Sequence, residues 1–360
     1  MERIWSIREY REDDKKGIFD LRKAVYGEPF NEQQWDWKYS NKPVKVAKIF
    51  LAENNGMIVG LRPVMFLPLK VMSRVVIAGL NADVMTHPDF RHRGIFSTLV
   101  REAFERVSNE EIEIVFTFPN ENSYLGYVKL GWPHICSVPL LAIPLNFNNL
   151  VRKYIKTTAL QKPTGSLLGL LFKGLHLGGR LGKTDISGFA LGRIYSFDNR
   201  FDELWYKVSN QHNIAVVRDS RYLRWRYADK PGQEYIILGI EKERELAGYI
   251  ILKSNVEMFG LKLGLIVDML TIEDKGITNA LLCHAIDYFK RAKMDIIGCL
   301  MLKHTAYYKA LRKAGFIEVP KPFSPKEFYF VGYTNSSKVA DATVYNVDNW
   351  FLTFGDIDIV

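Results

Sequence analysis

The sequence lacks the features that mark a membrane-spanning, disulfide-stabilised or zinc-binding protein. Its 360 residues contain no apolar run long enough to cross a bilayer, and the three cysteines show no metal-binding or redox spacing. The seven histidines do not cluster in the way that zinc ligands do. We therefore expect a cytoplasmic protein without a metal ion, whose length and apolar content suit two domains.

A second absence is local, because no aspartate or glutamate occurs from residue 122 to residue 184, in a chain with a formal charge of +9. Within that stretch, residues 150–183 are basic and rich in leucine and glycine. They are expected to connect the two domains, either packed against both or in peripheral contact with an anionic membrane. Nucleic acid is not expected as a partner, since aromatic residues do not alternate with the basic ones.

The most informative residues that are present begin at position 81. Residues 81–86 alternate with a period of two, which predicts a half-buried strand, and His87-Pro88 ends it. A basic loop then leads through Gly94 into apolar residues at helical spacing. The first amides of such a helix have no internal partner, and its dipole adds positive charge. This helix start can hold a diphosphate, with Arg91 and Arg93 adding charge-assisted hydrogen bonds.

The next residues supply a second strand and a second helix. Apart from Glu113, Ile112–Phe118 is a run of apolar and β-branched residues that is typical of a buried strand, and Pro119-Asn120 breaks it. Tyr127 follows, four residues before Gly131-Trp132. The predicted order is therefore strand, basic loop, helix, strand, Pro-Asn and Tyr.

This arrangement resembles the Gcn5-related N-acetyltransferase (GNAT) superfamily, whose signature is Gln/Arg-x-x-Gly-x-Gly/Ala. Arg91 and Gly94 match it, whereas Phe96 stands where the family usually has a small residue. The resemblance implies acetyl-CoA as co-substrate, two strands that splay around its pantetheine arm, and Tyr127 as the acid that protonates the leaving thiolate. The implied cofactor-binding residues are Val84, Met85, Thr86, Arg91, His92, Arg93, Gly94, Ile95, Phe96 and Asn120.

The general base is less clearly marked. Asp83 precedes the basic loop, points to the face opposite Val84, and could take the proton of an amine directly or through water. However, Asp83-Val-Met-Thr86 recurs as Asp268-Met-Leu-Thr271, and an aspartate present in both copies is as easily structural. Glu53 and the acidic residues of the C-terminal tail, Asp356 and Asp358, are weaker candidates. The tail aspartates could also pair with a cationic acceptor.

A longer internal repeat predicts two similar lobes. Trp37-Lys-Tyr-Ser-Asn-Lys-Pro43 recurs as Trp225-Arg-Tyr-Ala-Asp-Lys-Pro231. The fold class expected is α/β (α+β), with two tandem GNAT-like lobes that each have a mixed, centrally splayed sheet flanked by helices. The division expected is a first lobe over residues 1–149, a basic apolar connector over 150–190, and a degenerate second lobe over 191–360.

The second copy lacks the parts that would bind CoA. Glu273 and Asp274 occupy the loop that is basic in the first copy and would repel a diphosphate. His304 aligns with Asn120, and Leu311 aligns with Tyr127. The site is therefore expected in the first lobe, and the second lobe is expected to add stability and a wall of the acceptor pocket.

The function expected is transfer of an acetyl group from acetyl-CoA to a primary amine of a small molecule. The two-lobed plan resembles tandem enzymes that modify surface-polysaccharide sugars, which implies an amino sugar or a nucleotide-linked amino sugar as acceptor. Two alternatives stay open: a Fem-like aminoacyl transfer from charged tRNA, and a non-catalytic GNAT-like protein that only binds CoA or another ligand.

Overall fold

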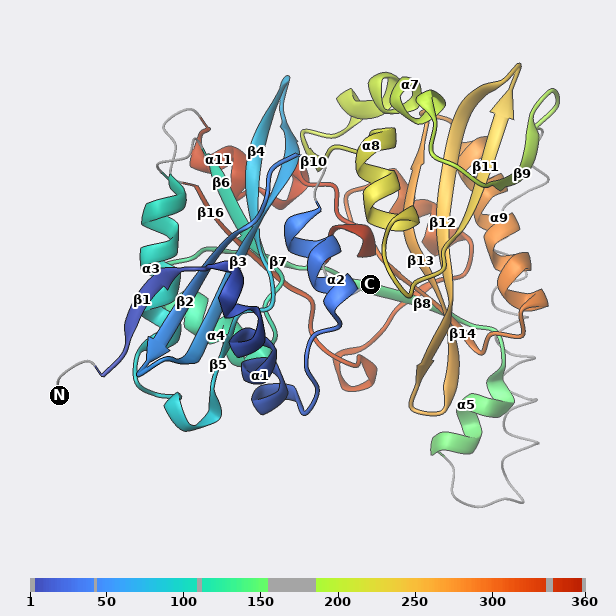
Figure 1. Ribbon diagram of the computed structural model, residues 1–360. Helices are drawn as coiled ribbons and strands as arrows, with labels where there is room; N and C mark the ends of the chain where they lie inside the picture. The colour runs from blue at the N-terminus through green and yellow to red at the C-terminus, as the bar shows by residue number, and fades with distance from the viewer. Residues whose placement is uncertain (1–3, 42–43, 109–111, 155–185, 335–338, 358–360) are drawn as a thin grey trace.

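Two β-sheets stand side by side in the computed structural model, each flanked by helices (Figure 1). The structure describes the chain except for residues 1–3, 42–43, 109–111, 155–185, 335–338 and 358–360. We call the nine-stranded sheet and its helices the first lobe, and the seven-stranded sheet and its helices the second lobe. Both sheets contain parallel and antiparallel pairs, so the predicted α/β class with two mixed sheets is confirmed.

The sheet of the first lobe has the order β1-β2-β3-β4-β6-β16-β7, and β5 and β10 add to β3 outside this path. Among the strands that the structure describes in this sheet, β4 and β6 are the one parallel pair, and the other pairs are antiparallel. Its strands are β1 (Ser6–Glu9), β2 (Lys48–Asn54), β3 (Met57–Val71), β4 (Arg74–Asn81), β5 (Met85–Thr86), β6 (Ile114–Thr117), β7 (His134–Ser137), β10 (Ile214–Val216) and β16 (Tyr329–Thr334).

The sheet of the second lobe has the order β15-β8-β14-β13-β12-β11-β9. Here β13 and β14 form the parallel pair, as β4 and β6 do in the first lobe. Its strands are β8 (Leu140–Pro144), β9 (Ala190–Ile194), β11 (Ile236–Lys242), β12 (Glu245–Met258), β13 (Leu261–Thr271), β14 (Ile296–Leu300) and β15 (Ile317–Glu318).

The two sheets exchange strands. β8 precedes the connector in sequence but pairs with β14 and β15 of the second lobe. In the other direction, β16 and β10 follow the connector but pair with strands of the first lobe. Neither sheet is therefore built from one continuous half of the chain.

Helices cover both faces of the first sheet. α3 and α4 pack on one face, where their apolar side chains form a separate core with Val64 and Phe66 of β3. α1 and α2 pack on the other face, whose core continues into the second lobe. The helices are α1 (Lys15–Tyr26), α2 (Glu32–Trp35), α3 (Ile95–Ser108), α4 (Glu121–Lys129), α5 (Phe147–Tyr154), α7 (Asn199–Val208), α8 (Ser220–Leu223), α9 (Lys275–Arg291), α10 (Ala306–Lys313) and α11 (Asp341–Val344).

The sequence repeat is also a structural repeat. α2 and α8 each begin at a side-chain cap, Asn31 or Asp219, and each runs into a π-helical turn that carries the Trp-x-Tyr motif. The indole N–H of Trp37 donates to the carbonyl of Trp225 at 2.7 Å, and the indole N–H of Trp225 donates to the carbonyl of Trp37 at 3.1 Å. The two rings stack with their centres 5.0 Å apart. Equivalent residues of the two lobes thus bind each other by the same contact in both directions.

The prediction of one strand over residues 81–86 is wrong. β4 ends at Asn81, and the chain turns at Asp83, which has a φ of 46°, before it resumes as β5. Aspartate tolerates this left-handed conformation better than most residues. The interruption matters because β4 pairs with β6 before it, whereas β5 after it pairs with β3.

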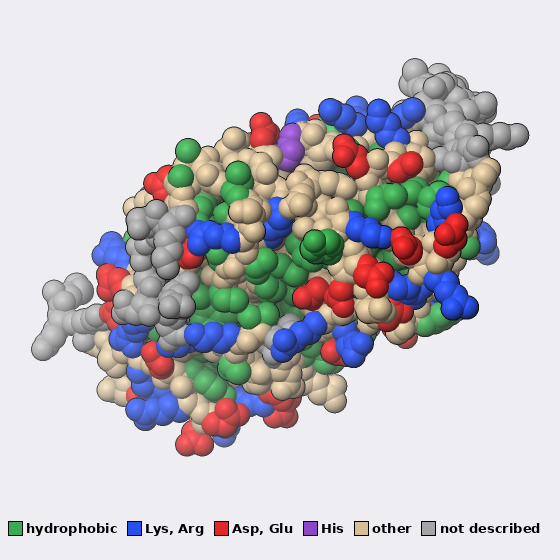
Figure 2. Space-filling model, turned by 90° about the horizontal axis from the view of Figure 1, so that it is seen from above, with side chains coloured by type: hydrophobic (Ala, Val, Ile, Leu, Met, Phe, Trp, Pro, Cys, Tyr) green, Lys and Arg blue, Asp and Glu red, His purple; other side chains and the backbone are tan. Residues whose placement is uncertain are grey.

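Apart from the end of α5, residues 150–183 of the connector lie outside the described residues. Packing against both lobes and contact with a membrane therefore both stay predictions. Among the helices that the structure describes, none combines the length and apolar character that crossing a bilayer requires. On the side of the molecule seen in Figure 2, basic and acidic side chains are interspersed. The basic side chains therefore do not form one continuous patch on that side of the molecule.

Candidate active site

The site is organised by the separation of two parallel strands. β4 and β6 pair from Ala78 opposite Ile114 to Asn81 opposite Thr117. Beyond this point β5 pairs only with β3, while the chain that follows β6 turns into α4. The two strands therefore separate beyond this pair. Val84, Met85 and Thr86 follow β4 on one side of the separation, and Asn120 follows β6 on the other.

The start of α3 faces this end of the sheet and is uncapped. Gly94 has a φ of 76°, which a residue with a side chain rarely adopts, and the hydroxyls of Ser97 and Thr98 both donate to its carbonyl. Within the described chain, no acceptor binds the amides of residues 95–97. These three orphan amides and the helix dipole make such an end attractive to an anion.

The basic residues of this loop are available to a ligand. Arg91, His92 and Arg93 are exposed, and no carboxylate of the described residues pairs with either arginine. The guanidinium of Arg93 lies 5.0 Å from the ring centre of Phe90. The loop thus presents two unpaired cations beside the open helix start.

The equivalent helix start in the second lobe is already occupied. The carboxylate of Asp274 caps α9 and accepts hydrogen bonds from the amides of Gly276 at 2.6 Å and Ile277 at 3.1 Å. A phosphate would have to displace this carboxylate and would meet the charge of Glu273 as well. The difference between the two helix starts supports placing the nucleotide in the first lobe.

Phe96, the departure from the family signature, points away from the loop into the core. Its ring lies 5.2 Å from that of Tyr127 in an edge-to-face arrangement. Gly126 makes room for it, because a Cβ at that position would lie 2.5 Å from the ring. The bulky residue is therefore accommodated by a glycine on α4 and does not fill the helix start.

Asn120 and Tyr127 both belong to α4. Asn120 is exposed and caps the helix, with its side-chain oxygen accepting from the Ser123 amide at 3.0 Å. Tyr127 is buried between Phe96 and Trp132, and its hydroxyl has no hydrogen-bond partner among the described residues. Burial raises the pKa of the phenol, while nearby Arg62 and Thr117 act in the opposite direction. Tyr127 is therefore a neutral hydroxyl that can donate a proton.

Comparison with known proteins agrees with this geometry. Residues 6–135 match the family described as "Acetyltransferase (GNAT) domain", which spans the separated strands, the α3 loop and α4. This part of the chain is a GNAT acetyltransferase domain. The expected superfamily, GNAT, and the expected enzyme class, acyltransferase, are thus confirmed. No curated protein matches the chain in sequence.

Solved structures extend the likeness of fold to both lobes. A GCN5-related N-acetyltransferase from Anabaena variabilis shares 12% identity, with coverage of 91% of this chain and 72% of that one and a TM-score of 0.63. A GCN5-related N-acetyltransferase from Kribbella flavida also shares 12%, with coverage of 92% and 71% and a TM-score of 0.59. N-myristoyltransferase of Saccharomyces cerevisiae shares 13%, with coverage of 93% and 80% and a TM-score of 0.59.

Asp83 of the GNAT domain is held in a polar cluster. Its carboxylate accepts from Lys38 Nζ at 2.7 Å and from the Tyr39 hydroxyl at 2.5 Å, and Arg22 lies 4.0 Å away. Burial acts to raise the pKa of Asp83, but Lys38, Tyr39 and Arg22 together keep it below its ordinary value. A carboxylate in this state is a weak base.

The same cluster recurs in the second lobe. The hydroxyl of Tyr227, from the second Trp-x-Tyr motif, donates to Asp268, just as Tyr39 donates to Asp83. An arginine, Arg218, takes the place of the cation. This recurrence supports the structural interpretation of Asp83, although the catalytic one stays a prediction.

The weaker candidates for the base are engaged elsewhere. Glu53 pairs with Arg8 at 2.5 Å. Asp356 is buried and pairs with Arg218 at 2.8 Å, but it also lines the cleft described below, so its pairing with a cationic acceptor stays a prediction. Asp358 lies outside the described residues. In the alignment of the two lobes, Thr305 rather than His304 caps α10 and so corresponds to Asn120.

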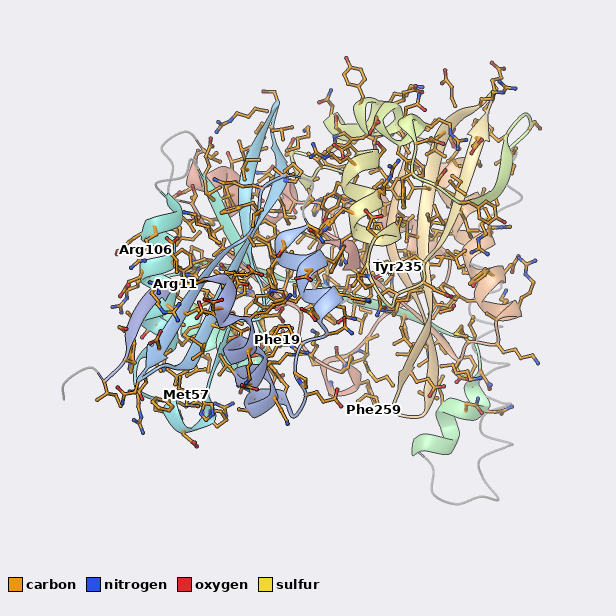
Figure 3. The ribbon with its side chains drawn as sticks, in the orientation of Figure 1. Arg11, Phe19, Met57, Arg106, Tyr235 and Phe259 are labelled. Atoms are coloured by element: carbon orange, nitrogen blue, oxygen red, sulfur yellow. The ribbon has the colours of Figure 1, made fainter. Side chains whose placement is uncertain are left out.

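A cleft between the lobes meets the opposite face of the first sheet. Its cavity volume is about 10 Å³, room for about one water molecule, and it approaches the end of β4 at Leu80. Lys38, the partner of Asp83, also lines it. Side chains from both lobes crowd this boundary in Figure 3, between the labelled Phe19 and Tyr235. The full lining is Trp37, Lys38, Met65, Leu67, Leu80, Tyr222, Trp225, Arg226, Gly355, Asp356 and Ile357.

Sequence reasoning missed three buried polar residues beneath the opening, Arg62, Asn81 and Thr117. Arg62 was visible as a lone charge within the otherwise apolar run from Met57 to Leu69. No metal-binding group of His, Cys, Asp and Glu occurs among the described residues.

Proposed function

We propose that the protein is an N-acetyltransferase that moves an acetyl group from acetyl-CoA to a primary amine by direct attack. The uncapped start of α3, beside the separated strands and on the same side as Tyr127, supports this proposal most strongly. The exposed residues Arg91 and Arg93 would hold the diphosphate with the free amides. The pantetheine arm would pair with backbone groups of residues 84–86, and Asn120 would lie beside it.

Two faces of the first lobe would contribute to the chemistry. The amine would approach through the cleft and lose its proton to solvent or, through water, to Asp83. An amide at the strand opening would donate to the oxyanion of the tetrahedral intermediate. Tyr127, from the α4 face, would then protonate the leaving thiolate.

The two-lobed plan and the lining of the cleft by both lobes support an amino sugar, free or nucleotide-linked, as acceptor. Trp37 and Trp225 stack on each other and hold the lobes together beside the cleft, while Lys38 adds positive charge that would attract a phosphate. Because the cleft is lined from both lobes, the second lobe would form a wall of this pocket. Peripheral contact of residues 150–183 with an anionic membrane stays a separate proposal, as does a cytoplasmic location.

Other functions differ from this proposal in ways that can be stated. The tandem fold is shared with N-myristoyltransferase, whose solved structure holds myristoyl-CoA, so a longer acyl chain is compatible with the architecture. A Fem-like transfer from charged tRNA would leave the free helix start of α3 without a role. A non-catalytic binding protein would bind acetyl-CoA but release no CoA from it.

The decisive experiment compares binding at the two helix starts. Acetyl-CoA at about one hundred times its Kd should stabilise the protein by about 2.7 kcal/mol, which a thermal melt detects. The double variant Arg91→Ala/Arg93→Ala should lose most of this effect. Lys275→Ala, at the start of α9, is the matched control and should keep it. Loss of the effect in the control alone would place the nucleotide in the second lobe and refute the proposal.

A further inference from the structure

A buried arginine without an anionic partner lies beneath the proposed site. Arg62 of β3 is fully buried, and its guanidinium donates to the carbonyls of Leu99 and Val100 in α3 and to the side-chain oxygen of Asn81 at 3.1 Å. Within the described chain no carboxylate contacts it, and its Nε atom has no hydrogen-bond partner. An unpaired buried cation is costly to the fold, so its presence requires a compensating role.

The neighbours of Arg62 connect it to Tyr127. Asn81 and Thr117 form the last pair before β4 and β6 separate, and the Thr117 hydroxyl donates to the Asn81 carbonyl at 3.0 Å. In the part of the chain that the structure describes, the side-chain nitrogen of Asn81 and the hydroxyl of Tyr127 are buried without hydrogen-bond partners. The guanidinium of Arg62 lies 5.9 Å from the ring centre of Trp132, whose ring centre lies 5.0 Å from that of Tyr127. Burial lowers the pKa of Arg62 to about 10, and Tyr127 counteracts this. The cation is therefore electrostatically coupled to the phenol.

The second lobe shows that the fold does not need this polar cluster. Strand pairing places Ile250 where Arg62 stands, because Leu238 faces Ile250 as Phe50 faces Arg62. By the same comparison Ile266 corresponds to Asn81, and Leu311, with the same helix-end hydrogen bond, corresponds to Tyr127. All three are buried apolar residues. The cluster thus occurs only in the lobe that has the open helix start, which points to chemistry rather than to packing.

We propose that Arg62 is a positioning residue for acyl transfer, which stabilises the phenolate that Tyr127 becomes when it protonates the leaving thiolate. This inference rests on the proposed function. In the step, the carbon–sulfur bond breaks and its electron pair moves to sulfur. The Tyr127 O–H bond breaks, an S–H bond forms, and the remaining pair stays on the phenolate oxygen near Arg62. The proton lost by the acceptor nitrogen returns to Tyr127 through solvent.

Asn81→Asp tests this inference with little change in shape. The new carboxylate would neutralise the guanidinium that Asn81 now contacts, so packing is kept while the charge acting on Tyr127 is lost. We expect the kcat for release of CoA from acetyl-CoA, with glucosamine as the amine, to fall roughly 10- to 100-fold. The KM for acetyl-CoA and the melting temperature should not fall with it. A merely structural role predicts unchanged or improved behaviour, since the buried cation gains a partner.

Two further comparisons exclude a folding defect. Arg62→Lys should keep more activity than Arg62→Gln, because it retains the charge. In a Tyr127→Phe background, Asn81→Asp should cause no further loss, since the charge acts through the phenol. Multiplicative losses in that double variant, or full activity of Arg62→Gln per folded molecule, would overturn the role of Arg62. Failure of the wild-type protein to release CoA, with glucosamine or with water alone, would instead overturn the proposed function and this inference with it.

Discussion

Tyr127 combines a buried hydroxyl without a partner with the position expected for the acid. Tyr127→Phe should lower kcat by roughly 100-fold or more, because a positioned proton donor is lost, and should leave acetyl-CoA affinity unchanged. Stability should not fall, since the change removes a buried polar atom that has no hydrogen bond. Steady-state kinetics and a thermal melt check both parts. An unchanged kcat would remove Tyr127 from the mechanism.

For Asp83 we expect the opposite result, a loss of stability with little change in kcat. Asp83→Asn should reduce the free energy of unfolding by roughly 1–3 kcal/mol, because the charge of the carboxylate in its partly buried pair with Lys38 is lost. Asp268→Asn is the matched control in the second lobe. If Asp83 is structural, both variants lose stability while kcat per folded molecule persists. A large loss of kcat for Asp83→Asn alone would identify it as the base.

The pH dependence of stability follows from the same carboxylate. The pKa of Asp83 is lower in the folded protein than in the unfolded chain, so the unfolded state binds the proton more tightly. The stabilisation is complete above about pH 5 and is lost as the pH falls below about 4. Denaturant unfolding of wild type and Asp83→Asn at pH 7 and pH 3.5 should therefore show a difference that shrinks in acid. A constant difference would contradict the assignment.

These residues show what a sequence can predict about a site. The loop from Arg91 to Gly94 was predictable, since glycine and charge at a helix start have a local cause. The pairing of Asp83 with Tyr39 was not, because 44 residues separate them and only the folded sheet brings them together. The residues next to Asn81 in sequence do not mark it as part of a site, because its role depends on where β4 and β6 separate in the folded sheet.

At the scale of elements, α3 and α4 depend on one close contact. Gly126→Ala should destabilise the protein by about 1–3 kcal/mol, since the new methyl group would meet the Phe96 ring. Phe96→Leu in the same chain should restore part of the loss by making room. Chemical denaturation of the single and double variants measures the coupling. Additive losses would show that the two helices do not pack as described.

Strand partners were harder to predict than strands. The apolar residues of β8 and β16 indicate strands, but hydrophobic alternation does not state which sheet a strand joins. Long-range pairing decides that β8 enters the second sheet and β16 the first. The repeat of Trp37 and Trp225 likewise predicted two similar lobes, yet it gave no sign that the two indoles bind each other.

At the scale of the whole molecule, Arg218 links three parts of the chain. It follows β10 of the first sheet and contacts Asp268 of β13 at 3.2 Å and Asp356 of the C-terminal tail at 2.8 Å. All three side chains are buried. The tail is thereby fixed against the boundary of the lobes, where it lines the cleft.

Removing this link should weaken both lobes together. Arg218→Met leaves two carboxylates buried without their cation, which should cost about 3–5 kcal/mol of unfolding free energy. Arg200→Met removes more exposed ion pairs with Asp198 and Glu241 and should cost less than about 1 kcal/mol. Adding Asp356→Asn to Arg218→Met should recover part of the loss, because one uncompensated charge disappears. If Arg218→Met melts like Arg200→Met, the lobes are held by their apolar contacts and the buried ion cluster is dispensable.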